Sequence, residues 1–289
     1  MRLRRAIKRL VGLDRPVFLL GVGAQKAGTT WLYQYLKSCA NSNMGQLKEY
    51  HVWDGLLQPD RFPEFDLKSS TSSASDVPAL QRQFQSKPSA YFTYFRGLTK
   101  RQQLTGDITP SYCGLTADDF RTVRRMIRRA GFRPRVVFLM RDPVRRCWSA
   151  SRMSARNEQM KGGRAWSRDE VLTHFAQQFG SPDYAIRTRY EDTLEALDQA
   201  FRRHEVHLGF YESMFETSEI HRLAKFLNVP VKLHERDHIR NASPSIELPA
   251  SLHQQCHAFY QSTYEYCWRR FPETRALWTN SSGSTETGR

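Results

Sequence analysis

The residues best suited to chemistry lie near the start of the chain, in the segment GVGAQKAGTTWL at residues 21–32. Lys26 stands inside a loop between two glycines, and Thr29 and Thr30 follow directly. The backbone N–H groups of such a loop, and of the helix that follows it, point at a bound phosphate. The two hydroxyl groups can donate further hydrogen bonds. Lys26 adds a positive charge beside the bond between that phosphate and the group it carries.

The glycines of this loop have the same spacing as those of the nucleoside-triphosphate loop GxxxxGK[ST]. Thr29 stands where that motif has its lysine, and the lysine of this chain lies three positions earlier, at Lys26. A P-loop nucleotide kinase is therefore an alternative that lacks one of its required residues. It would also need an acidic ligand for magnesium.

A second candidate site follows the most apolar segment of the chain, in VVFLMRDPVRRCWS at residues 136–149. Arg141 comes directly after the apolar run, and Ser149 comes eight positions later. Ligands of parallel sheets bind where strands end. The planar guanidinium of arginine donates two charge-assisted hydrogen bonds to a phosphate. Arg141 and Ser149 therefore predict a second anion-binding position, with a structural Arg141–Asp142 ion pair as the alternative.

A third segment, KEYHVWD at residues 48–54, offers two groups that could accept a proton, Glu49 and His51. On an extended strand, residues two apart share a face, so both side chains would reach the same cleft. The charge of Lys48 would keep the carboxylate of Glu49 ionised. The spacing does not decide between Glu49 and His51 as the base.

Together these segments resemble the sulfotransferases that use 3′-phosphoadenosine 5′-phosphosulfate (PAPS). QKAGTTWL is similar to their 5′-phosphosulfate loop of the type PKSGTTWL, and RDP followed by a serine is similar to their 3′-phosphate motif. The resemblance implies PAPS as donor, without a metal ion. It also implies that Arg141 and Ser149 hold the 3′-phosphate and that Trp31 lies near the adenine. The loop residues that would bind the donor are Gln25, Lys26, Ala27, Gly28, Thr29 and Thr30.

The resemblance further implies the catalytic residues. Lys26 would stabilise the leaving phosphate, and KEYHVWD resembles the KExHFFD segment of carbohydrate sulfotransferases, whose glutamate is the base. Glu49 is therefore the candidate base and His51 the second choice. The loop has the GTTW form of the cytosolic branch, but GDITPSY at residues 106–112 lacks that branch's histidine. This favours Glu49 as the base, and the resemblance implies a hydroxyl of a carbohydrate or glycolipid as acceptor.

The elements that would position these residues alternate along the chain. The segments Val17–Leu20, 103–108, 135–140 and 206–211 are predicted to be strands, and the first and third of them are apolar runs. Helical patterns lie between them, and a long helix is expected from Pro249 to Phe271. Such alternation predicts an α/β fold with a central parallel sheet flanked by helices. We expect a single domain over residues 1–278.

Composition restricts the partners. The formal net charge is +15 and the isoelectric point is near 9.9, so the natural ligands are anions. Charge alone supports one further alternative, a non-enzymatic polyanion-binding protein; we expect no nucleic-acid partner. The five cysteines are scattered and form no CxxC pair, which favours a reducing compartment. With no apolar run of membrane-spanning length, we expect a cytoplasmic protein.

Three further segments carry predictions of their own. Residues 1–13 combine an apolar stripe with five basic residues, a pattern able to lie on an anionic membrane. The alternative is a short helix docked on its own domain. Residues 56–103 have weak periodicity and are expected to form an insertion over the site, with one or two helices after residue 77. Residues 279–289 are polar and expected to be disordered.

Overall fold

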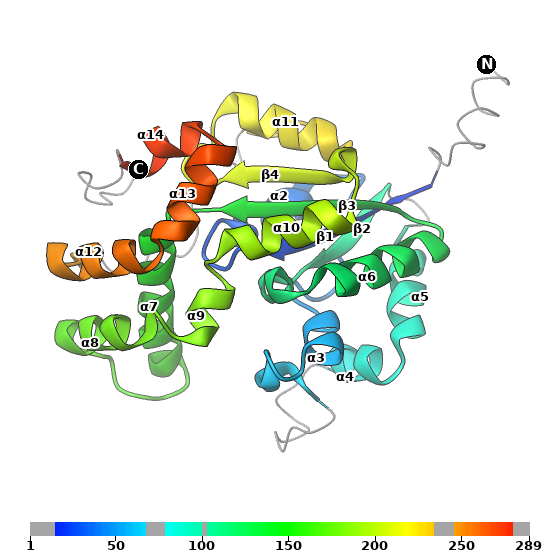
Figure 1. Cartoon of the computed structure of the whole chain (residues 1–289). Helices are drawn as coiled ribbons and strands as arrows, with labels where there is room; N and C mark the ends of the chain where they lie inside the picture. Colours follow the sequence, from blue (N-terminus) through cyan, green and yellow to red (C-terminus); the bar gives the residue numbers. More distant parts are fainter. Residues whose placement is uncertain (1–14, 68–78, 100–102, 234–245, 280–289) are drawn as a thin grey trace, which may run out of the picture.

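The computed structural model describes residues 15–67, 79–99, 103–233 and 246–279. Within them, four strands form one parallel sheet in the order β2-β1-β3-β4 (Figure 1). The strands are β1 Val17–Gly23, β2 Leu104–Ile108, β3 Arg133–Met140 and β4 Val206–Phe210. This confirms the predicted α/β fold with a central parallel sheet. The predictions for residues 1–13, and for the tail beyond residue 279, lie outside the described residues.

Helices cover both faces of the sheet. Tyr190 of α10 (Tyr190–Ala200) packs on Phe138 of β3, with ring centroids 5.8 Å apart. Phe226 of α11 (Thr217–Leu227) packs on His207 of β4 at 5.3 Å. His207 pairs with Val137, and side chains alternate along a strand, so His207 and Phe138 face opposite ways. Burial on both faces explains why β1 and β3 are almost continuously apolar.

The remaining helices follow the predicted alternation with the strands. Ser167 and Glu170 form a capping box at the start of α8. The other elements are α2 Thr29–Ser38, α3 Trp53–Leu57, η1 Pro63–Phe65, α4 Ala79–Ser86, α5 Pro88–Leu98, η2 Pro110–Gly114, α6 Ala117–Arg129, α7 Pro143–Met160, α8 Arg168–Gln178, α9 Pro182–Ile186, η3 Arg203–Glu205, α12 Ala250–Phe259, α13 Gln261–Arg270 and α14 Glu273–Thr279.

The single long helix expected at 249–271 is wrong, because the chain breaks at Tyr260 into α12 and α13. The hydroxyl of Tyr260 donates to the carbonyl of Phe179 at 2.6 Å, which ties this point to the end of α8. Such a tertiary anchor interrupts a helix without changing its apolar periodicity, so the pattern did not reveal it.

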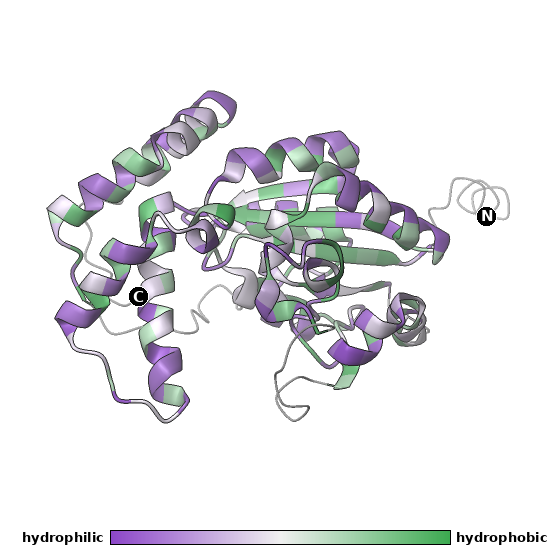
Figure 2. Ribbon diagram, turned by 60° about the horizontal axis from the view of Figure 1, so that its bottom comes forward, coloured by the Kyte–Doolittle hydropathy of each residue, from purple (hydrophilic) through white to green (hydrophobic). Residues whose placement is uncertain are grey.

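Hydrophobic residues dominate the strands, whereas the helices mix hydrophobic and hydrophilic residues (Figure 2). The ring of Phe18 on β1 contacts four other rings at centroid distances of 5.1–5.8 Å. Three of these rings, Tyr91, Phe92 and Phe95, come from α5. Within residues 56–103, α5 therefore packs on the sheet, whereas α4 lies closer to the segment that carries Glu49.

Two findings bear on the surroundings of the protein. Among the described residues, no helix is both long and apolar enough to cross a bilayer. All five cysteines are buried and none is in a disulfide.

Candidate active site

The loop between β1 and α2 has the geometry of an anion site. Gly28 is the N-cap of α2 with φ 93°, and Lys26 is also in the left-handed region, at φ 69°. The N-cap provides no side-chain hydrogen bond, and the first turn of α2 contains no acidic residue. The first N–H groups of a helix have no partner within it, so they are directed at whatever binds in front of α2.

Arg141, from the second predicted anion-binding position, lies against this loop. Its Nη1 donates to the carbonyl of Lys26 at 3.2 Å, and its guanidinium lies 4.2 Å from the centre of the Tyr211 ring. Arg141 is only 5% exposed. Asp142 caps α7 by accepting from the N–H of Arg145 at 2.8 Å, which fixes the start of the helix that carries the half-buried Ser149.

Several positive charges converge on Lys26. Burial is the largest cause that lowers the pKa of its amine, and the charges of Arg156, Arg141, Arg152 and Lys48 add to it in that order, so that the pKa falls to about 8. The sequence interpretation missed Arg152 and Arg156. Their signal was helical spacing, because they follow Ser149 at intervals of three and four residues on one face of α7. This crowding of like charges fits a ligand with several negative charges, such as PAPS.

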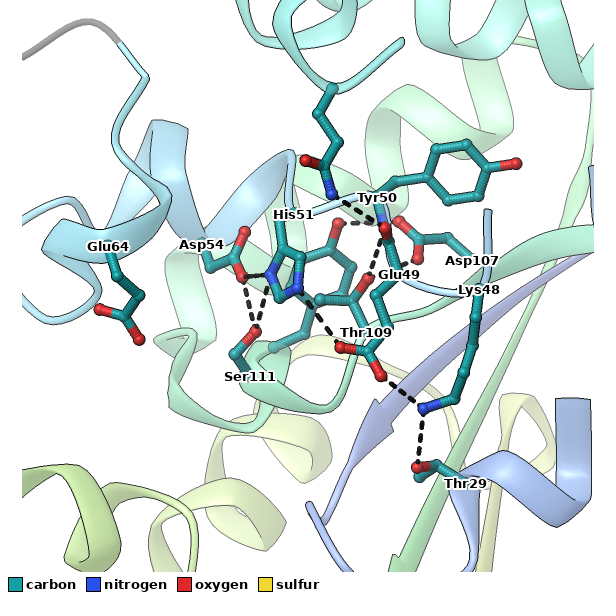
Figure 3. A network of polar contacts seen from close by, with 12 residues as sticks. Thr29, Lys48, Glu49, Tyr50, His51, Asp54, Glu64, Asp107, Thr109 and Ser111 are labelled. Carbon is teal, nitrogen blue, oxygen red and sulfur yellow. Dashed lines mark hydrogen bonds and ion pairs between the residues drawn. The ribbon is translucent and has the colours of Figure 1, made fainter. Parts of the chain in front are cut away.

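A row of polar contacts connects the loop to the predicted base (Figure 3). Lys48 Nζ lies 3.5 Å from Thr29 Oγ1 and forms an ion pair with Glu49. Glu49 Oε2 lies 3.3 Å from His51 Nε2, and His51 Nδ1 lies 2.7 Å from Asp54 Oδ2. The structure therefore brings together the phosphate loop, Lys48 and both candidate bases.

The two candidate bases have opposite electrostatic environments. Burial would raise the pKa of Glu49, but the hydrogen bonds and charges of His51 and Lys48 lower it to about 2. Burial would lower the pKa of His51, but its hydrogen bonds to Asp54 and Glu49 raise it to about 9. Near neutral pH, Glu49 is thus ionised and His51 is protonated, with both ring nitrogens directed at carboxylates.

Residues 48–52 form no strand, so a shared strand face is not what brings Glu49 and His51 together. His51 has φ 48°, in the left-handed region, and α3 begins two residues later. The side chains meet because the chain turns back on itself. Asp54 was not singled out from the sequence, although a carboxylate three positions after His51 was the available signal. Ser111 adds a hydrogen bond to Asp54 Oδ2 at 2.5 Å.

Asp107 supports this segment from behind. It is fully buried and accepts hydrogen bonds from Tyr91, Tyr112 and Thr109 at 2.9, 2.8 and 2.6 Å. The hydroxyl of Thr109 in turn accepts from the backbone N–H of Tyr50 at 3.0 Å. Burial raises the pKa of Asp107 to about 6. The end of β2 therefore fixes the backbone between the two candidate bases.

The other predicted donor-binding residues lie around the same loop. Trp31 is 7% exposed; it stacks on Tyr35 with centroids 5.1 Å apart and meets the edge of Phe215 at 5.5 Å. Ala27 is buried and Gln25 and Thr30 are half-buried. Their roles toward the donor, and that of Trp31 toward adenine, remain predictions.

Comparison with known proteins identifies the family of this chain. Residues 14–245 match the sulfotransferase domain family. The chain belongs to the sulfotransferase family. This enzyme is therefore expected to move a sulfuryl group with the donor its family generally uses, PAPS, and the kinase and polyanion-binding alternatives lose their support. No curated protein matches the chain in sequence.

Three solved structures are similar to the chain, and the first of them shares its fold. A sulfotransferase from Alicyclobacillus acidocaldarius has a TM-score of 0.56 and 18% identity, over 86% of this chain and 93% of that one. A sulfotransferase domain from the curacin biosynthetic pathway has a TM-score of 0.43 and 15% identity, over 84% and 96%. A sulfotransferase domain from the Synechococcus PCC 7002 olefin synthase has a TM-score of 0.43 and 14% identity, over 84% and 94%.

The part of the chain that the structure describes contains no group of three or more histidine, cysteine, aspartate or glutamate residues arranged to hold a metal ion.

Proposed function

We propose that this enzyme transfers the sulfuryl group of PAPS to a hydroxyl of a carbohydrate or glycolipid, with Glu49 as the base. The observation that carries the proposal is the continuous row from Thr29 through Lys48 to Glu49, which places a carboxylate directly beside the phosphate loop. PAPS supplies an activated sulfuryl group on its 5′-phosphate. The chain must then bind the nucleotide, accept the acceptor's proton and stabilise charge on the leaving phosphate.

Binding and charge stabilisation fall to the loop and α7. The N–H groups at the start of α2 and the amine of Lys26 face the 5′-phosphosulfate position. Arg141 and Ser149 are the proposed ligands of the 3′-phosphate. Since Arg141 also donates to the carbonyl of Lys26, the two phosphate positions are mechanically connected.

Glu49 is favoured over His51 as the base because it keeps a lone pair that can accept a proton. Both ring nitrogens of His51 face carboxylates and its pKa is raised to about 9, so the ring is already protonated at neutral pH. A carboxylate oxygen has a second lone pair after accepting one hydrogen bond. Glu49 can therefore accept the acceptor's proton while His51 holds it in place. Lys48 lies between Glu49 and Thr29. Its ammonium group can move toward negative charge on the sulfonate, and the carboxylate of Glu49 then becomes more basic.

The acceptor class and the compartment are the less direct parts of the proposal. A carbohydrate or glycolipid acceptor rests on the similarity of KEYHVWD to the carbohydrate branch and on the absence of histidine in GDITPSY. Five free, buried thiols fit a reducing compartment, and we propose a cytoplasmic enzyme. Contact of residues 1–13 with an anionic membrane remains part of this proposal.

Glu49→Gln tests the base, because it keeps the shape of the side chain and removes its basicity. We expect kcat to fall by roughly 10²–10⁴-fold, the usual contribution of a general base. The affinity for adenosine 3′,5′-bisphosphate, measured by calorimetry, should stay unchanged. Glu195→Gln, at an exposed position of α10, is the matched control. An active Glu49→Gln enzyme beside an inactive His51→Asn enzyme would assign the role to His51.

A further inference from the structure

His51 holds a backbone conformation that needs support. Among the described residues, only Lys26, His51 and Asn228 are non-glycine residues with positive φ. Asn228 ends α11 in the usual left-handed cap. Lys26 and His51 both belong to the proposed catalytic machinery. A left-handed conformation is unfavourable for a residue with a Cβ atom, so it persists only where surrounding contacts hold it.

The contact that holds the backbone of His51 comes from Gln85 on α4. Gln85 is 3% exposed, and its Nε2 donates both to the carbonyl of His51 and, at 2.8 Å, to the carbonyl of Phe65. Its Oε1 accepts from the N–H of Leu67 at 3.3 Å. One amide therefore uses both of its N–H groups and its oxygen, which leaves this side chain little freedom to move.

The same amide also fixes the ring that covers His51. The ring of Phe65 stacks on the imidazole, with centroids 3.6 Å apart and planes inclined by 15°. Since Gln85 binds the carbonyls of both His51 and Phe65, it sets the two rings relative to each other. The imidazole is then confined in its plane, with Nδ1 toward Asp54 and Nε2 toward Glu49.

A second glutamine acts one helical turn earlier. Gln81 Nε2 donates to the carbonyl of Glu49 at 3.1 Å. Residues four apart lie on one face of a helix, so α4 presents two amides side by side to the two carbonyls. On the opposite side, the carbonyl of Lys48 accepts from the N–H of Ile108 on β2 at 3.3 Å. The segment that carries Glu49 and His51 is thus held between the sheet and α4.

We propose that Gln85, assisted by Gln81, is a positioning residue for catalysis that keeps the His51 ring aligned on Glu49. This inference rests on the proposed role of Glu49 as the base. Neither glutamine touches the reacting atoms; both act through the backbone of the residues that do. Loss of Gln85 would free the turn at His51 and let Nε2 leave Glu49, which would then lose a hydrogen bond to its carboxylate.

The test replaces Gln85 by Met, which has a similar length and can donate no hydrogen bond. We expect kcat to fall roughly 10- to 100-fold, as for a small misplacement of a catalytic group. The KM for PAPS and the affinity for adenosine 3′,5′-bisphosphate should not change. Gln83→Met is the matched control, because Gln83 is an exposed residue of the same helix. Gln81→Met removes a single hydrogen bond and should have a smaller effect on kcat.

A second readout follows the imidazole itself, by NMR titration of the His51 ring assigned with His51→Asn. The raised pKa of His51 depends on its contacts with Glu49 and Asp54, so Gln85→Met should lower it, whereas Gln83→Met should not. Unchanged kcat and unchanged titration in a folded Gln85→Met enzyme would overturn the proposal. If Gln85→Met does not fold, the same two measurements on Gln81→Met decide. The titration does not require Glu49 to be the base, so failure of the base assignment would be seen separately.

Discussion

At the scale of single residues, the site contains several positive charges that repel one another as long as no anion is bound. Lys26 is surrounded by Arg141, Arg152, Arg156 and Lys48, and its pKa is lowered to about 8. An anion bound at the loop favours the protonated amine. The pKa of Lys26 must therefore rise when the nucleotide binds, and binding takes up a proton wherever the free amine is deprotonated.

The affinity for adenosine 3′,5′-bisphosphate should consequently decrease above about pH 8, where the free amine is deprotonated. One such group limits the decrease to about tenfold per pH unit. Calorimetry at several pH values measures it, in buffers of different ionisation enthalpy to count the protons. Lys26→Arg keeps the charge at every pH in this range and should remove the decrease. An equal pH dependence in that variant would show that another group is responsible.

The same residues show what the sequence could predict. Lys26 and Arg141 were singled out because Lys26 lies in the loop after one apolar strand, Arg141 directly follows another, and each has a distinctive local motif. Asp54, Arg152 and Arg156 had only their spacing as a signal, and their proximity depends on the left-handed turn at His51 and on how α7 lies against the loop. Motifs record local geometry, whereas these contacts arise from tertiary packing.

At the scale of elements, the loop and α2 meet at a position that only glycine fits. Gly28 has φ 93°, and a Cβ atom there would lie 2.5 Å from the sulfur of Met214. The close approach allows α2 to begin directly behind the loop, with its N–H groups facing the ligand. The start of α2 therefore depends on Gly28.

Gly28→Ala should lower the free energy of unfolding by about 1–3 kcal/mol, the cost of a strained backbone conformation. It should also weaken bisphosphate binding, because the first turn of α2 must shift. Gly97→Ala in α5 is the contrasting control: nothing lies within 4 Å of its added Cβ, so it should stabilise the protein by about 0.5–1 kcal/mol. Chemical denaturation and calorimetry measure both variants. Wild-type stability and affinity in Gly28→Ala would refute this account of the loop.

Element types were more predictable than element ends. Burial on both faces leaves a nearly continuous apolar pattern in β1 and β3, whereas β2 and β4 include polar residues such as Asp107 and His207. The break at Tyr260 was not predictable, since it depends on a hydrogen bond to a carbonyl 81 residues away. Residues 48–52 form no strand; contacts from α4, β2 and η2 hold this segment, and no local sequence pattern reveals such contacts.

At the scale of the whole molecule, the C-terminal helices support a site to which they contribute no predicted ligand. Helices α12–α14 lie beyond residues 14–245, which match the family. Yet Tyr264 of α13 donates to Asp142 Oδ2 at 2.7 Å. Trp278 of α14 donates to Glu212 Oε2 at 3.2 Å, and Glu212 Oε1 accepts from the N–H of Asp142 at 2.9 Å. The residue after Arg141 is thereby held from both helices.

Trp278→Phe tests this support, because it removes one N–H donor and retains most of the buried ring. Glu212 would lose a partner in a site where burial already raises its pKa, so its ionised form should become less favourable. We expect the free energy of unfolding to fall by about 1–3 kcal/mol.

Because Glu212 holds the backbone next to Arg141, the affinity for adenosine 3′,5′-bisphosphate should fall more than that for adenosine 5′-monophosphate, which lacks the 3′-phosphate. Trp166→Phe, at a half-buried tryptophan in the segment before α8, is the control and should change neither affinity. Equal losses for the two nucleotides in Trp278→Phe would mean that α14 stabilises the fold as a whole and has no specific connection to the 3′-phosphate position.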